Sequence, residues 1–278
     1  MKGYRYMFLE KSDVSLYYEI RGEGEALVLI HGMIVDAGLY ETAAQILANK
    51  YKVVTFDRRG NSRSTLKGFP APEFSMDAQA EDIKDLMEAA GVEEAYVAGA
   101  SAGAVIGHYF LQKYPEKVKH LIMYEPSMLG LMISKDPETA EWYETLNGFV
   151  QKGKINNALL RFAQSIGEAD DRSPVKSQEA VVRELDNVEF AFKNEMPGAA
   201  RYIPDLDSFK QYSDRITIAA GERSRGNRYE KQAIFLGSLM GKKPLYYPGG
   251  HNLPFELPAE YAMCILGTLQ LNGNRNDC

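Results

Sequence analysis

Residues 95–106 read Ala95-Tyr96-Val97-Ala98-Gly99-Ala100-Ser101-Ala102-Gly103-Ala104-Val105-Ile106, a strand-forming run that passes through Gly-x-Ser-x-Gly into small residues tolerated by a helix. A serine on a sharp strand-to-helix turn projects its hydroxyl beyond the carboxyl end of the strand, and so tight a turn needs very small neighbours. The stretch therefore predicts an exposed nucleophile at Ser101. The competing interpretation is a glycine-rich turn that only packs a helix closely or cradles an anion. Glycine or alanine fills the positions around the serine, namely Gly99, Ala100, Ala102, Gly103, Ala104 and Gly107.

Strand-forming segments on either side of this stretch alternate with helical patterns. Residues 4–9 and 14–20 are typical of an antiparallel hairpin at a sheet edge. A continuous apolar run, typical of a strand buried on both faces, follows at 26–30. Further buried strands are predicted at 52–56 and 118–124, and strands again at 215–220 and 244–247. Helical patterns occupy about 38–49, 76–90, 228–240 and 258–270. Such alternation predicts an α/β fold with a mostly parallel, doubly wound sheet of about eight strands.

Right-handed crossovers bring the carboxyl ends of parallel strands to one edge of the sheet, where binding sites form. His31, Asp57, Ser101 and Glu125 each follow a predicted strand. All four are therefore expected at that edge.

The strand signal disappears between 126 and about 212, where helical patterns occupy 138–152, 155–167, 177–195 and, more loosely, 197–211. We expect a core of residues 1–126 and 212–278 with a helical cap of residues 127–211 inserted above the site. Most apolar side chains of such a cap form its own small core. The start of the cap is a candidate apolar wall, and the candidate substrate-binding residues are Met128, Leu129, Met132 and Trp142.

Composition narrows the functional classes. The chain has 278 residues, 45% hydrophobic, with a net charge of −6 and no basic cluster, which argues against nucleic-acid binding. No apolar run has the length of a membrane span or of a signal-peptide core. Cys264 falls in a helical pattern and Cys278 is the last residue, so we expect no disulfide scaffold and a cytoplasmic location. No set of metal-ligating residues at the required spacing is present, so neither a metal nor a cofactor is expected, and a homodimer is left open.

A serine nucleophile needs a base within hydrogen-bond reach, and an acid must orient that base. Of the four histidines, His108 falls within the helix after Ser101 and His120 within a strand, where packed or solvated side chains are expected. His31 directly precedes a turn. His251 lies on a Gly-Gly loop after the last strand, free to approach Ser101, and is the predicted base.

These residues, in this order, resemble the α/β-hydrolase superfamily over nearly the whole chain. The resemblance rests on His31-Gly32, the Gly99-Ala100-Ser101-Ala102-Gly103 elbow, the helical cap and the late His251. It implies that Ser101 is the nucleophile and His251 the base, with the backbone N–H groups of Met33 and Ala102 as the oxyanion hole. It also implies a structural role for His31 and for the turn that begins at Asp57.

The position of the acidic residue that would orient His251 departs from the commonest pattern of the family. Ser224 stands where an aspartate is expected after the glycine that ends the strand over 215–220. We favour Glu125, which resembles the branch of the family that takes its acid from the end of the preceding strand. Glu222 is the alternative acid, and a site without a carboxylate is the third option.

A serine at the elbow argues against epoxide hydrolases and dehalogenases of this fold, which attack with aspartate. The resemblance then implies acyl transfer to water, with a small, largely apolar ester, thioester or lactone as the substrate. A C–C bond hydrolase or a cofactor-free perhydrolase would use the same three groups. A non-catalytic small-ligand receptor on this fold is the further alternative, kept open by the missing aspartate.

Overall fold

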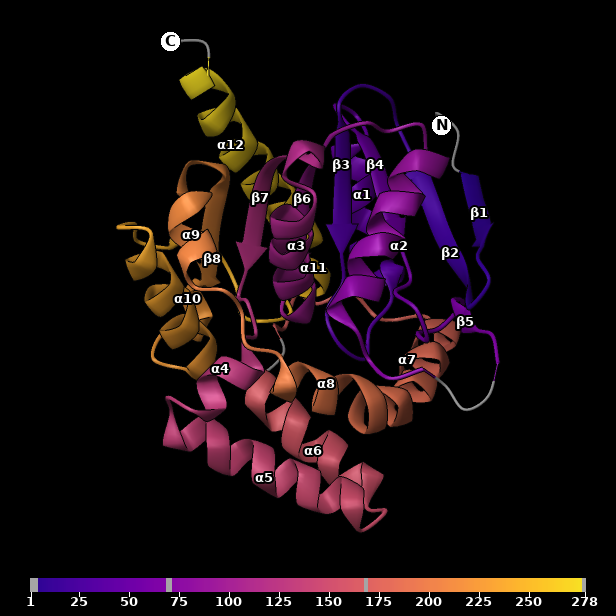
Figure 1. The fold of residues 1–278 in the computed structure, drawn as a ribbon, viewed down its shortest axis with the longest axis vertical. Coiled ribbons are helices and arrows are strands. Elements are labelled where there is room, and N and C mark those ends of the chain that lie inside the picture. Colours follow the sequence, from indigo (N-terminus) through magenta and orange to yellow (C-terminus); the bar gives the residue numbers. More distant parts are fainter. Residues whose placement is uncertain (1–4, 69–71, 168–169, 277–278) are drawn as a thin grey trace.

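The computed structural model describes residues 5–68, 72–167 and 170–276 (Figure 1). Cys278 and the first residue of the predicted strand 4–9 lie outside that part of the chain. The strands are β1 (Arg5–Glu10), β2 (Val14–Arg21), β3 (Ala26–Ile30), β4 (Lys52–Phe56), β5 (Thr65–Leu66), β6 (Ala95–Ala100), β7 (Val118–Tyr124), β8 (Ile216–Gly221) and β9 (Leu245–Tyr247). The longer helices are α1 (Glu41–Leu47), α2 (Met76–Ala89), α3 (Ala102–Lys113), α5 (Pro137–Gln151), α6 (Ile155–Ile166), α7 (Gln178–Phe190), α10 (Arg228–Leu239) and α12 (Pro258–Asn276). The shorter ones are η1 (Ala37–Tyr40), η2 (Pro115–Lys117), α4 (Leu129–Ile133), η3 (Ala191–Glu195), α8 (Met196–Arg201), α9 (Asp207–Gln211), η4 (Ser213–Arg215), η5 (Glu222–Ser224) and α11 (Leu253–Glu256).

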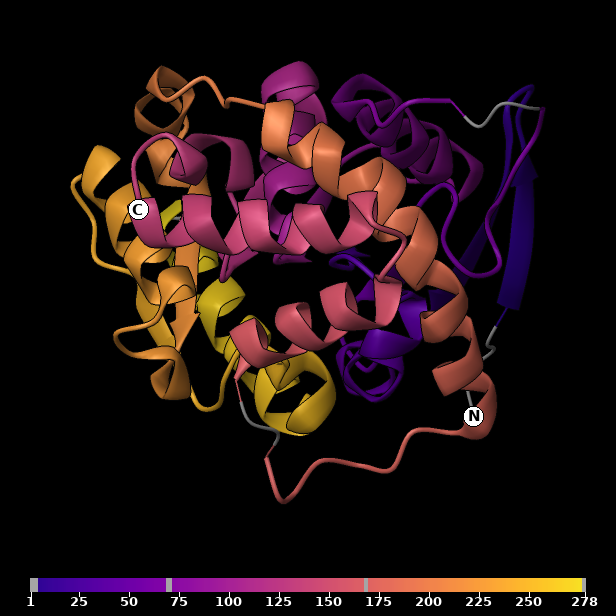
Figure 2. The same cartoon turned by 90° about the horizontal axis from the view of Figure 1, so that it is seen from below.

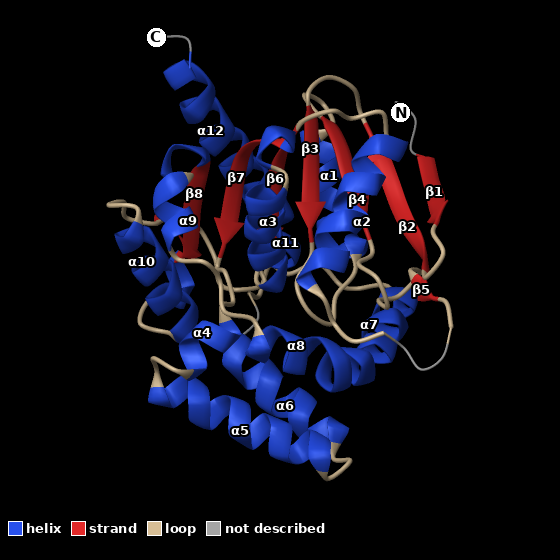
Figure 3. Cartoon of the chain, in the orientation of Figure 1, coloured by secondary structure: helices blue, strands red, loops and turns tan. Residues whose placement is uncertain are grey.

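The strands of the described residues form one nine-stranded sheet in the order β1-β2-β4-β3-β6-β7-β8-β9, with β5 paired to β2. All neighbours from β4 to β9 are parallel, whereas β1, β2 and β5 pair antiparallel. The predicted fold class, a mostly parallel sheet between helices, is confirmed. Figure 3 shows helices on both faces of the sheet. The two-residue strand β5 is an addition to the predicted strands, too short to leave a periodic pattern.

Two apolar cores, one on each face, hold the sheet between its helices. Along β3, Val28 and Ile30 belong to the core under α2, α3 and α10, whereas Leu27 and Leu29 belong to the core under α1 and α12. Successive side chains of a strand point to opposite faces, so a strand covered on both faces must be apolar throughout. All five residues of β3 are buried accordingly.

Helices α4–α8 form a cap beyond the carboxyl ends of the parallel strands, toward which the arrowheads of β3 and β7 point in Figure 1. Figure 2, a view from below, shows α5 and α6 lying across this edge of the sheet. The cap has its own apolar cluster, which includes Trp142, Leu146 and Phe192 and is joined by Ile34 from the core. The pattern over 197–211 forms two short helices, and Phe209 of the second, α9, packs into the core under α3.

The long predicted helix 177–195 runs through α7 into a π-helical turn, η3, and continues as α8. Pro197 follows this turn, and a proline inside a helix lacks an N–H and clashes with the carbonyl four residues earlier. The wider turn, in which the Met196 N–H reaches the carbonyl of Ala191, accommodates it. The turn also carries Glu195, whose side chain is buried against the core.

Candidate active site

Ser101 lies between the end of β6 and the start of α3 with φ 56° and ψ −122°. Its N–H donates to the carbonyl of Tyr124 at 3.0 Å. Gly103 permits this turn because a Cβ there would lie 2.1 Å from the carbonyl oxygen of Ile30. The strand-turn-helix geometry expected for the Gly-x-Ser-x-Gly motif is therefore present.

His251 and Glu125 meet at the same edge of the sheet. The imidazole Nδ1 is 2.7 Å from Glu125 Oε2, and the other carboxylate oxygen accepts the N–H of Gly221 at 2.7 Å. Glu125 is completely buried, and His251 is 8% exposed. The imidazole also stacks on Tyr229, with ring centroids 3.7 Å apart. Because the carboxylate engages Nδ1 as its hydrogen-bond acceptor, Nε2 is the nitrogen left to accept a proton.

Glu222, the alternative acid, points elsewhere. Its carboxylate pairs with Arg225 at 2.8 Å, and both side chains are about half exposed. Ser224, at the position where the family commonly has an aspartate, is buried. Of the two candidate carboxylates, the fold brings Glu125 to the imidazole.

Ser101 and His251 line one cavity of about 260 Å³ beneath the cap. Its apolar lining from α6 includes Leu159, Phe162 and Ile166. Among the described residues, no side chain is hydrogen-bonded to the hydroxyl of Ser101, which faces this cavity. Serine–imidazole hydrogen bonds are often long in ligand-free enzymes and shorten when substrate binds. The cavity therefore brings the Ser101 hydroxyl and the His251 imidazole to one space.

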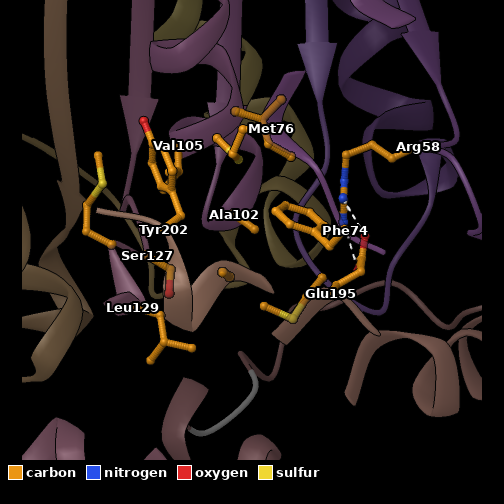
Figure 4. Close-up of a pocket in the computed structure, with 13 residues that line it drawn as sticks. Arg58, Phe74, Met76, Ala102, Val105, Ser127, Leu129, Glu195 and Tyr202 are labelled. Carbon is orange, nitrogen blue, oxygen red and sulfur yellow. Dashed lines mark hydrogen bonds and ion pairs between the residues drawn. The ribbon is translucent and has the colours of Figure 1, made fainter. Parts of the chain in front are cut away.

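The expected oxyanion donors lie beside Ser101. A Cβ on Gly32 would come within 3.1 Å of the Ser101 Cβ, so the chain leading into Met33 passes close to the serine. The N–H of Ala102 opens α3 and has no carbonyl within its own helix to bond. Met33 and Ala102 both line a second, smaller cavity (Figure 4). Stabilisation of an oxyanion by the N–H groups of Met33 and Ala102 stays a prediction.

The smaller cavity has about 20 Å³ of space, enough for a water molecule. Met128 and Leu129, two of the candidate substrate-binding residues, line it. Met132 packs into the core under α3, and Trp142 lies in the apolar cluster of the cap. None of the four lines the Ser101 cavity, because Met128 and Met132 pack into the core under α3 and Leu129 and Trp142 into the apolar cluster of the cap.

Sequence reasoning missed a buried ion pair at this cavity, between Arg58 and Glu195 of the cap (Figure 4). The guanidinium reaches the two carboxylate oxygens at 2.5 and 3.2 Å and also donates to the carbonyls of His31 and Gly32. Arg58 belongs to the turn that begins at Asp57, for which the family resemblance implies a structural role. Glu195 carried no sequence signal, because its partner lies far away in the chain.

His31, His108 and His120 are all buried and each contacts a neighbouring group. His31 accepts the Arg58 N–H at 2.9 Å and contacts the Gly32 carbonyl at 2.7 Å. Burial and the nearby Arg58 charge lower the pKa of the His31 imidazole to about 3, so this ring is neutral at physiological pH. His108 contacts Ser208, and His120 contacts Thr217.

No helix within the described ranges is long and apolar enough to cross a bilayer. In the same part of the chain, no group of three or more His, Cys, Asp or Glu side chains is arranged to hold a metal ion.

Comparison with known proteins identifies the family. The profile of the alpha/beta hydrolase fold family matches residues 25–198. An uncharacterized hydrolase, YraK of Bacillus subtilis, is 29% identical over 248 residues, which cover 87% of this chain and 88% of that protein. The fold is shared with two Bacillus subtilis structures, carboxylesterase CesB (TM-score 0.71, 17% identity) and naproxen esterase (TM-score 0.73, 16% identity), each covering 96% of this chain and 92% of its own. The chain belongs to the alpha/beta hydrolase fold family.

Proposed function

We propose that the protein is a serine hydrolase that cleaves a carboxylic ester, thioester or lactone through an acyl-enzyme on Ser101. One observation carries the proposal: a buried carboxylate, Glu125, holds the His251 imidazole at 2.7 Å on the cavity that Ser101 also lines. An imidazole oriented in this way can activate a serine hydroxyl as a nucleophile.

The reaction follows from this arrangement. Ser101 Oγ attacks the carbonyl carbon of the substrate while its proton passes to His251 Nε2. Glu125 stabilises the imidazolium that forms, and the N–H groups of Met33 and Ala102 stabilise the oxyanion. The imidazolium then protonates the leaving alcohol or thiol. A water molecule, deprotonated by His251, attacks the acyl-enzyme and releases the acid and Ser101.

A small, largely apolar acyl group suits the cavity. Its volume of about 260 Å³ lies just below the usual range of ligand pockets, and Leu159, Phe162 and Ile166 give it an apolar wall. Carboxylesterase CesB and naproxen esterase share the fold, which agrees with ester chemistry. The receptor alternative loses support because Glu125 supplies the carboxylate that position 224 lacks. The cytoplasmic location and the homodimer stay predictions.

Labelling with a fluorophosphonate tests the nucleophile. We expect one label on Ser101, none on Ser101→Ala, and labelling slowed by at least about 100-fold in His251→Ala. Ser238→Ala is the matched control, because that hydroxyl is on α10 and donates to the carbonyl of Phe235. An unlabelled wild-type protein that is folded would overturn the proposal.

A panel of p-nitrophenyl esters, thioesters and vinylogous diketones then separates ester cleavage from C–C bond hydrolysis.

Paired substitutions test the acid. We expect Glu125→Gln to lower kcat by about 10² to 10⁴, because a neutral amide cannot stabilise the imidazolium. Glu222→Gln removes a carboxylate that faces Arg225 at the surface, so its kcat should match that of the wild type. Equal activity of both variants would contradict the assignment of Glu125.

A further inference from the structure

A further cavity, of about 290 Å³ and distinct from the two described above, lies between the cap and the start of α10. Arg161, Gln164 and Ser165 line it from α6, whereas the α6 residues on the Ser101 cavity are Leu159, Phe162, Ala163 and Ile166. At 3.6 residues per turn these two sets lie on opposite faces of the helix. The cavity is therefore separate from the site at Ser101, and we call it the α5–α6–α10 cavity.

Buried nitrogen atoms without a partner surround the α5–α6–α10 cavity. Among the described residues, Trp142 Nε1, Arg161 Nε and two nitrogens of Arg228, Nε and Nη1, make no hydrogen bond although each is buried. Trp142 is only 5% exposed. All three residues line the cavity. Each of these atoms is a donor that cannot accept, so the group that satisfies them must be an acceptor.

The charge of the lining residues also favours an acceptor, because it is positive. Arg161, Arg228 and Lys231 face one carboxylate, Glu138, which pairs with Lys231 at 2.8 Å. Within the described part of the chain, no carboxylate forms an ion pair with either arginine. Among the residues that the structure describes, two guanidinium groups at one cavity thus have no carboxylate partner, in a chain of net charge −6. Uncompensated arginines are the usual partners of carboxylate and phosphate groups.

The surrounding elements hold this donor set in place. The Arg228 guanidinium lies 3.6 Å from the centre of the Trp142 ring, a cation–π contact that joins α10 to α5. Arg228 is the first residue of α10, a helix of 12 residues whose amino-terminal end carries partial positive charge. The Asn227 side chain caps the helix through the N–H groups of residues 229 and 230, so these two N–H groups are already bonded and the side-chain donors face the cavity.

We infer that the α5–α6–α10 cavity binds a small oxyanion, a carboxylate or a phosphoryl group, through Arg161, Arg228 and the indole N–H of Trp142. The site is independent of the proposed reaction at Ser101. Its ligand bridges the cap, which supplies α5 and α6, and the core, which supplies α10. Binding therefore stabilises the cap in the position described here.

Trp142 is the only tryptophan of the chain, so its fluorescence reports on this site directly. The full chain is titrated with inorganic phosphate and, separately, with succinate, while chloride keeps the ionic strength constant. We expect a saturable change in emission and a rise in Tm with either anion. A change that is linear in concentration and equal to that caused by chloride would overturn the inference.

Substitutions assign the binding to the cavity. Arg228→Gln and Arg161→Gln should each raise the apparent Kd for phosphate by about 10-fold or more, because each removes a charged donor. Arg201→Gln is the matched control, since that guanidinium is 61% exposed on α8 and pairs with the exposed Glu73 carboxylate at 3.5 Å, away from the cavity. Saturable binding that survives both cavity substitutions would place the anion elsewhere and contradict the inference.

A third variant tests the site independently, in case the arginine variants do not fold. Trp142→Phe keeps an aromatic ring under Arg228 and removes the indole N–H. Calorimetry should then show weaker phosphate binding while circular dichroism stays that of the wild type. Unchanged affinity in this folded variant would exclude the indole from the site.

Discussion

Ser101 and Glu125 lie on backbone with positive φ, at 56° and 43°. For residues other than glycine such a conformation costs about 1–2 kcal/mol, and it persists only where the surroundings enforce it. Here the N–H of Ser101 bonds the carbonyl of Tyr124 at 3.0 Å, and the N–H of Glu125 bonds that of Ala219 at 2.8 Å. Backbone hydrogen bonds to the neighbouring strands thus fix the backbone of both residues. This backbone conformation directs both side chains toward the site.

His108 gives stability a pH dependence. Burial lowers the pKa of its imidazole to about 3, so the folded protein keeps the ring neutral. An unfolded chain takes up a proton below about pH 6.5. Proton uptake by the unfolded chain therefore lowers the free energy of unfolding as the pH falls from about 6.5 toward 3, and has no effect above that range.

The variant His108→Gln removes this proton uptake. Between about pH 4 and 6, the slope of the unfolding free energy against pH should fall by up to about 1.4 kcal/mol per pH unit, as measured by urea denaturation. Ser208→Ala, which removes the hydroxyl 3.0 Å from His108 Nε2, keeps the imidazole and should keep the slope. An unchanged slope in His108→Gln would show that another group dominates this pH range.

At the scale of elements, the contact of α3 with β3 sets the position of the nucleophile. The helix approaches so closely that a Cβ on Gly103 would lie 2.1 Å from the carbonyl oxygen of Ile30 and 2.6 Å from that of His31. Both obstacles are backbone atoms of a central strand and its end, which have little room to move.

We therefore expect Gly103→Ala to lower the free energy of unfolding by about 3 kcal/mol and to displace Ser101. Gly148→Ala on α5 is the matched control, because a Cβ there has nothing within 4 Å. That substitution should raise stability by up to about 1 kcal/mol, the usual helix preference for alanine over glycine. Chemical denaturation measures both variants, and equal stabilities would contradict the close packing of α3.

At the scale of the whole molecule, the Arg58–Glu195 pair joins the cap to the core. The two side chains are 1% and 2% exposed, and Asn61 also donates to the carboxylate, at 3.2 Å. A buried charge that loses its partner is strongly destabilising, because water cannot solvate it. The pair is thus an electrostatic tie between segments far apart in the chain.

Glu195→Gln should lower the free energy of unfolding by about 3–5 kcal/mol, measured by denaturant titration. Glu189→Gln, earlier in the chain on α7, breaks an exposed pair with Lys193 and should change stability by less than about 1 kcal/mol. Similar effects of the two substitutions would mean that the buried pair contributes no more than a surface pair.

Local patterns predicted the elements that surround the site. The apolar run over 26–30 predicted a doubly covered strand, and the small residues around Ser101 predicted its turn, because both depend on neighbouring residues alone. The triad acid was less certain. Chain position showed that Glu125 and Glu222 each follow a strand, but it contained no information on which way either side chain points.

The sequence by itself determined the sheet, the elbow at Ser101 and the loop that carries His251, since apolar periodicity and glycine placement act over a few residues. Only the tertiary structure decided that Glu125 reaches His251 while Glu222 pairs with Arg225, and that Arg58 is neutralised by Glu195 of the cap. These contacts depend on the packing of strands and helices distant in the chain. No local pattern encodes that packing.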